Sequence, residues 1–168
     1  DRDVYRGPKS SSYRPRDLST WRKVVGYVDT SFVRSNVRFI LMNNVRHSDS
    51  GMTEYVGGFT ETQKHWLDSV LNVGAPALTV LATHIPFSQM KGRDSVLALV
   101  PEGTRRLYVS GHTHYVSRDE SVPELIVGAT CGSWWRGVKD GDGIPYALQS
   151  CGSPRGYFIA DFHRDGRY

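Results

Sequence analysis

Hydrophobic and polar positions divide the chain into short apolar runs and amphipathic segments. The run VRFILM at residues 37–42 is almost wholly apolar and predicts a central strand. Residues 30–44 (TSFVRSNVRFILMNN) contain two such runs around a polar break, so we expect a hairpin there. Two further apolar runs, PALTVLATH at residues 76–84 and RRLYVSGHTH at residues 105–114, predict buried strands that both end at histidine.

Helical periodicity occupies segments around and between these strands. TETQKHWLDSVLN at residues 60–72 is predicted to form a helix, because Thr60 and Gln63 have the spacing of a capping box. The apolar stripe of this helix consists of Trp66, Leu67, Val70 and Leu71. Shorter helices are expected within residues 17–26 and within residues 93–100.

The rest of the chain is predicted to form loops and two late strands. Residues 45–59 are polar and Gly-rich, and residues 131–154 contain too much Gly and Pro for regular structure, so both are expected to be loops. LIVGAT at residues 125–130 and GYFIADF at residues 156–162 are predicted strands. Strands that alternate with helices indicate an α/β fold built on a layered sheet.

Composition limits the class of protein. The chain has 168 residues, of which 39% are hydrophobic and 23% are charged, and this suits one globular domain. We expect no membrane partner, because no apolar run approaches the roughly 18 residues that a span needs. The formal net charge is +4, and residues 1–23 alone hold seven Lys and Arg against three Asp. Residues 1–17 are therefore expected to form a basic, solvated arm, and residues 18–168 to form part of a single domain.

The two cysteines, Cys131 and Cys151, leave two interpretations open. They could form a disulfide in an oxidising compartment, or they could be two buried free thiols. They do not have the CxxC spacing of a zinc knuckle or a redox site.

Three of the six histidines follow apolar strands. His84 ends one run, and His112 and His114 end the next. If the two strands are parallel, their carboxyl ends deliver the imidazoles to one edge of the sheet, where ligands collect. Residues i and i+2 of an extended segment lie on one side, roughly 6–7 Å apart, which would suit two ions about 3.5–4 Å apart. The alternative is that these side chains are hydrogen-bonded structural histidines, as we expect solvated or structural roles for His47, His65 and His163.

The carboxylates do not complete such a site. A two-metal hydrolytic centre needs Asp or Glu ligands as well as imidazoles. None of the 17 acidic residues lies in a strand-end pattern such as D-x-H or G-D-x-x-D. The residue pattern therefore predicts a partial metal site and identifies no catalytic residue.

Several motifs resemble one family. LATHIPF and VSGHTHYV resemble the last two metal-binding motifs of the calcineurin-like metallophosphoesterases. The segments SFVRSNVRFILMNN and YVGGFTETQKHWLDSVL are similar to elements of bacterial members, and CGSWWRGVKDGDGIPYALQSCGSPRGYFIADF looks like the C-terminal segment of a bacterial subgroup. The resemblance covers residues 18–162.

The resemblance implies a fold and a chemistry. The fold would be a four-layer α/β/β/α sandwich, with residues 18–168 as the C-terminal part of the metallophosphoesterase domain. The site would hold two divalent ions (Zn, Mn or Fe), with His84 and His112 on one ion and His114 on the other. The substrate would be a phosphomonoester or phosphodiester, and its pocket would be lined by Trp134, Trp135 and Arg136. The alternative for the two tryptophans is that they pack under the long loop as core.

The resemblance also implies that much of the enzyme lies elsewhere. The Asp-x-His, Gly-Asp-x-x-Asp and Gly-Asn-His motifs, and the N-terminal half of the sandwich, are missing from this chain. We therefore expect the C-terminal part of a longer enzyme, inactive alone, whose partner is the missing N-terminal segment; the alternative is a naturally reduced relative. The resemblance slightly favours an extracytoplasmic or periplasmic location.

A second class of function remains open. The chain could be a non-catalytic module that binds phosphate or nucleic acid and keeps the fold without the chemistry. Nucleic acid is a poor fit, because the basic arm offers only Tyr5 and Tyr13 as stacking residues. A structural site for a single metal also fits poorly, because three histidines lack Cys or carboxylate partners.

Overall fold

The protein is built on one six-stranded mixed sheet, and two of the described helices pack on one of its faces. The computed structural model describes residues 18–47, 55–130, 135–148 and 153–168. The strand order is β1 (Thr30–Arg34), β2 (Val37–Leu41), β5 (Leu78–Ala82), β6 (Arg106–Ser110), β8 (Glu124–Ile126) and β7 (Ser117–Asp119). The four inner strands are parallel, and the edge strands β1 and β7 are antiparallel to their neighbours. The predicted α/β class, the β1–β2 hairpin and the histidine-terminated strands are thus confirmed.

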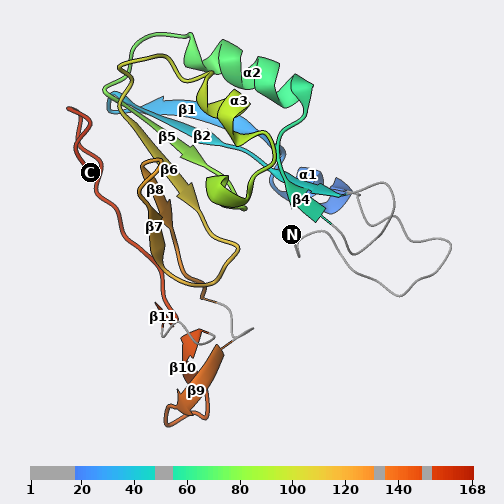
Figure 1. Ribbon diagram of the computed structural model, residues 1–168, viewed down its shortest axis with the longest axis vertical. Coiled ribbons are helices and arrows are strands. Elements are labelled where there is room, and N and C mark those ends of the chain that lie inside the picture. The colour runs from blue at the N-terminus through green and yellow to red at the C-terminus, as the bar shows by residue number, and fades with distance from the viewer. Residues whose placement is uncertain (1–17, 48–54, 131–134, 149–152) are drawn as a thin grey trace, which may run out of the picture.

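Two helices pack on one face of this sheet. They are α2 (Glu61–Leu71) and α3 (Arg93–Leu97), and Figure 1 shows them side by side over the sheet. The core beneath them contains Ile40, Leu81 and Tyr108 from the strands and Leu67 and Val96 from the helices. The two predicted short helices are α1 (Ser19–Val24) and α3. A 3-10 turn, η1 (Phe87–Gln89), follows β5.

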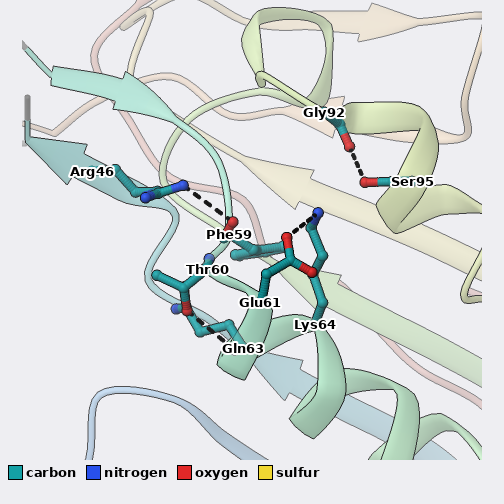
Figure 2. A network of polar contacts seen from close by, with 8 residues as sticks. All are labelled: Arg46, Phe59, Thr60, Glu61, Gln63, Lys64, Gly92 and Ser95. Carbon is teal, nitrogen blue, oxygen red and sulfur yellow. Dashed lines mark hydrogen bonds and ion pairs between the residues drawn. The ribbon is translucent and has the colours of Figure 1, made fainter.

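The start of α2 is fixed by the predicted capping box. The Thr60 hydroxyl accepts the N–H of Gln63 at 3.2 Å, and the Gln63 side chain accepts the N–H of Thr60 at 3.0 Å. Figure 2 shows this box beside an Arg46 guanidinium that donates to the Phe59 carbonyl and a Glu61–Lys64 ion pair. The Gln63 amide also donates to Asp29 and to the Asn43 carbonyl. The cap therefore attaches the helix to the carboxyl end of β2.

The cap makes a measurable contribution to stability. We expect Thr60→Ala to lower the free energy of unfolding by about 1 kcal/mol, since the N–H of Gln63 loses its acceptor. The measurement is urea denaturation followed by circular dichroism. Ser69→Ala is the control, because the exposed Ser69 hydroxyl donates only to a carbonyl within the helix. Equal losses in the two variants would contradict the role of the cap.

The other face of the sheet is apolar and is partly covered by the C-terminal segment. Val37, Leu78, Val80 and Leu107 form a second core cluster there, against which Phe162 packs. In Figure 1 this segment, in red, runs on the side of the sheet away from α2. Its end is attached to the amino-terminal edge of the strands through bonds from Asn36 to the Arg164 carbonyl and from Arg105 to the Asp165 carbonyl.

Gly166 makes the closest approach in this segment. Its φ is +82°, and a Cβ there would lie 2.5 Å from the carbonyl oxygen of Ala77. We expect Gly166→Ala to destabilise the chain by more than the roughly 1–3 kcal/mol of a left-handed non-glycine residue alone. Gly103→Ala is the control, since Gly103 has a φ of +77° and open space around it. Thermal denaturation compares the two, and a smaller loss at Gly166 would show that the segment is not docked as described.

Three predicted assignments are wrong. Residues 45–59 contain the paired strands β3 (Val45–His47) and β4 (Tyr55–Gly57) rather than loop alone. Residues 131–154 contain β9 (Trp135–Lys139), β10 (Pro145–Leu148) and β11 (Ser153–Pro154). The Gly-rich stretch between β9 and β10 is a turn, in which the Asp140 carboxylate accepts the N–H groups of Asp142 and Ile144. Residues 156–162 form no strand, because Tyr157, Phe158 and Ile159 face solvent and no ladder pairs this segment.

Two predictions concern residues that lie outside the described part of the chain. The basic arm at residues 1–17 and the pair Cys131 and Cys151 are not among the described residues. Of the helices described, none has the length and apolarity to cross a bilayer.

Candidate metal centre

Parallel pairing places the two histidine-bearing loops at one edge of the sheet. β5 and β6 are adjacent and parallel, with Ala82 opposite Val109. Their pairing continues past the strands: the N–H of Thr83 donates to the Val109 carbonyl, and the N–H of Gly111 donates to the His84 carbonyl at 3.1 Å. The backbone therefore holds the loops together up to the histidines, as the strand-end pattern predicts.

His84 and His112 meet directly. The Nδ1 atom of His112 lies 3.3 Å from the Nε2 atom of His84, and the ring planes are inclined by 71°. Two nitrogens that share a tetrahedral zinc ion at about 2.0–2.1 Å lie about 3.3–3.4 Å from one another. The separation of the two nitrogens thus fits two ligands of one ion, and it equally fits a hydrogen bond between the rings when the ion is absent.

The predicted extended geometry of His112 and His114 is wrong. Their φ angles are +67° and +64°, so both residues have a left-handed backbone rather than the extended backbone of a strand. This conformation is uncommon outside glycine, although histidine adopts it more readily than most residues. A residue in such a sparsely populated region persists only where the surrounding structure holds it, and such residues are frequent at functional sites. The i, i+2 argument for a pair of ions therefore does not apply to this loop.

His114 lines the same cavity as the other two histidines. The cavity has a volume of about 870 Å³ and extends over the apolar sheet face, where Val80 and Val109 contribute to its wall. Within the described residues no three His, Cys, Asp or Glu side chains are arranged to hold one ion. His84 and His112 are therefore a partial donor set, and the role of His114 on a second ion stays a prediction.

The surroundings of His112 favour its neutral form. Burial lowers the pKa of His112 from its ordinary value of 6.5, and nearby His114 lowers it further. The ring of Tyr55, from β4, meets His112 edge-on at 5.7 Å between centroids. A neutral imidazole is the form that binds metal, so the electrostatics agree with the geometry.

The lowered pKa gives the metal-free chain a pH dependence. Because the folded state binds the proton on His112 less readily than the unfolded state does, stability falls as the pH drops below 6.5. We expect the difference in unfolding free energy between wild type and His112→Asn to shrink in this direction. Asparagine does not titrate and tolerates positive φ. Urea denaturation at a series of pH values measures the difference, and a pH-independent difference would contradict the assignment.

Two buried polar residues near the pair were missed from the sequence. Asn44 follows β2 and is 0% exposed, and Glu124 begins β8 and is 1% exposed. Asn44 accepts the N–H of His84, and Glu124 accepts the N–H of Phe87 and the hydroxyl of Ser110. The available signals were an amide directly after a strand and a carboxylate inside the apolar run PELIV.

The predicted substrate residues are not joined to this site by any described contact. Trp134 lies outside the described residues. Trp135 and Arg136 belong to β9, in the small sheet that Figure 1 shows beyond β7, and their side chains are not among those described. Their role in binding substrate stays a prediction.

Comparison with known proteins supports the family predicted from the motifs. Residues 124–168 match the family model described as the C terminal of calcineurin-like phosphoesterase. The matched segment runs from β8 through the small sheet to the segment on the apolar face, and the three histidines precede it. A comparison with curated proteins gives no match.

The histidine pair lies at the carboxyl ends of adjacent parallel strands, which is the edge of an α/β sheet where ligands usually bind. Residues 124–168 are similar to the C terminal of the calcineurin-like phosphoesterases, so the predicted resemblance is confirmed for this segment.

Proposed function

We propose that this chain forms part of a metal-dependent phosphoester hydrolase. The observation that carries the proposal is the 3.3 Å approach of His84 and His112 at the carboxyl ends of adjacent parallel strands. The match of residues 124–168 to the calcineurin-like phosphoesterases supports the reaction class. Members of this family generally use divalent ions, and the paired imidazoles suit zinc, manganese or iron.

The residues present would hold one ion through two nitrogens. His84 would contribute Nε2 and His112 would contribute Nδ1, while His114 would serve a second ion from the same cavity. A divalent ion would supply a water of lowered pKa and would stabilise charge on phosphoryl oxygens. The chain's own contribution is to keep the imidazoles neutral and to hold them at the required separation.

We propose further that the domain is completed as a four-layer α/β/β/α sandwich. The apolar face carrying Val80 and Leu107 is covered only in part by the described C-terminal segment, and an open cavity lies over it. A second sheet on this face would bury that surface, as sheets with apolar faces require. In this arrangement residues 18–168 form the C-terminal part, and an N-terminal segment of the same protein supplies the carboxylate ligands.

The substrate would be a phosphomonoester or a phosphodiester. Arg136, with its planar guanidinium, would bind a phosphate through two hydrogen bonds, and Trp134 and Trp135 would line the pocket. The alternative proposal is a module that binds phosphate without hydrolysing it.

Metal binding tests the proposal directly. We expect the chain supplied with the upstream segment of its parent protein to bind Zn²⁺. We expect His84→Ala or His112→Asn to weaken this binding by well over tenfold, since even the loss of an indirect partner costs about 10–100-fold. Isothermal titration calorimetry with Zn²⁺ measures the affinity. His65→Ala is the matched control, because His65 lies exposed on α2.

Hydrolysis of an aryl phosphate distinguishes the two functions. The assay uses the chain supplied with the upstream segment of its parent protein. Turnover that His84→Ala abolishes would support the hydrolase. Zn²⁺ binding without turnover would favour the binding module, and no Zn²⁺ binding by wild type would refute the metal site.

A further inference from the structure

Two buried polar side chains stand behind the histidine loops, and the hydrolysis chemistry uses neither of them. We propose that Asn44 and Glu124 are positioning residues that set the separation and orientation of His84 and His112. The inference rests on the proposed function, because metal binding is the reason why the separation of the two imidazoles matters. It goes further by assigning roles to two side chains from the strands that flank β5 and β6.

Asn44 holds the first loop from the β2 side. Its Oδ1 atom accepts the N–H of His84 at 3.1 Å and the N–H of Ile85 at 2.9 Å. Its Nδ2 atom donates to the Ile85 carbonyl at 2.7 Å. One amide thus satisfies three backbone groups on two consecutive residues, and this fixes the direction in which the His84 side chain leaves the backbone.

Glu124 joins both loops from the β8 side. Its two carboxylate oxygens each lie 3.1 Å from the N–H of Phe87, three residues after His84. Its Oε1 atom also accepts the hydroxyl of Ser110 at 2.7 Å, two residues before His112. A single side chain therefore ties the far end of the first loop to the near end of the second.

The burial of Glu124 needs an explanation that packing does not provide. Removing a carboxyl group from water is costly unless hydrogen bonds compensate for the lost solvation. Burial raises the pKa of Glu124, while its bonds with Ser110 and Phe87 oppose this shift. A polar group of this kind stabilises a fold little more than an apolar residue would, but it demands a defined geometry from its partners.

Another buried charged residue in the same sheet provides the comparison. Arg38 on β2 is 4% exposed, and its guanidinium donates to the carbonyls of Leu71, the last residue of α2, and of Val73. Its described bonds involve neither histidine loop. The loss of Arg38 should therefore reduce stability without changing the histidine pair, which makes it a matched control for buried polar contacts.

The first test uses the metal-free chain. Long-range ¹H–¹⁵N correlation spectra report which ring nitrogen of each histidine is protonated. In the contact between His112 Nδ1 and His84 Nε2 one nitrogen must donate and the other accept, so the tautomers of the two rings are coupled. We expect wild type to show a single tautomer at both residues. Glu124→Leu and Asn44→Leu should each give mixtures, whereas Glu124→Gln, which can still accept from Phe87 and bond to Ser110, should restore the wild-type spectrum.

A milder variant keeps the test valid if the leucine substitutions prevent folding. Ser110→Ala removes one hydroxyl, keeps a side chain of similar size and leaves the Phe87 contact of Glu124 in place. Because the two rings are coupled through their contact, we expect a tautomer mixture at both histidines in this variant. Arg38→Leu should lower the melting temperature and leave both spectra unchanged. Single tautomers in folded Glu124→Leu, or in Ser110→Ala if the leucine variants do not fold, would overturn the proposal, as would equal changes in Arg38→Leu.

Zn²⁺ titration separates this proposal from the proposed function. In the chain supplied with the upstream segment, we expect Glu124→Leu to weaken Zn²⁺ binding by about 10–100-fold, with Glu124→Gln close to wild type. If wild type binds no Zn²⁺, the proposed function fails, and the tautomer spectra still decide whether Asn44 and Glu124 orient the pair. If wild type binds Zn²⁺ and Glu124→Leu binds it equally well, the positioning role is refuted while the metal site stands.

Discussion

The parallel pairing of β5 with β6 is the constraint on which the rest of this structure depends. Because Ala82 lies opposite Val109, both strands end at the same level, and the ladder continues until the N–H of Gly111 reaches the His84 carbonyl. A shift of one residue would turn the alternating side chains to the opposite face and would separate the two imidazoles. The helices, the second core cluster and the flanking strands all serve to keep this register.

The local pattern was enough to predict the elements that carry the histidines. β5 and β6 are continuous apolar runs bounded by polar residues, and α2 carries its capping box within its own sequence, so these signals need no distant partner. The predicted edge site followed from them, because parallel strands present their carboxyl ends together. The recognition of the family also came from short motifs, and the match over residues 124–168 supports it.

The failures have a common physical cause, which is dependence on partners that the residues of an element do not themselves identify. β3 and β4 are three residues each and exist because they pair across a segment that reads as loop. Tyr157, Phe158 and Ile159 have strand-forming side chains, yet within the described part of the chain no strand pairs with them. The left-handed backbone of His112 and the buried position of Glu124 likewise arise from the assembled sheet. Composition and spacing contain no information about the left-handed backbone, and the sequence signal for Glu124 is its place within the apolar run PELIV.

The left-handed conformation of His112 and His114 has a consequence for affinity. A loop held at these angles by the folded sheet has already lost the freedom that an ordinary loop would lose when it closes around a ligand. The entropy of ordering the loop is therefore lost when the domain folds and not when a ligand binds, so that the loop is preorganised for whatever it binds. Tight binding at this edge would then be obtained in exchange for a less stable domain, a trade that favours selectivity for ligands that fit the fixed arrangement.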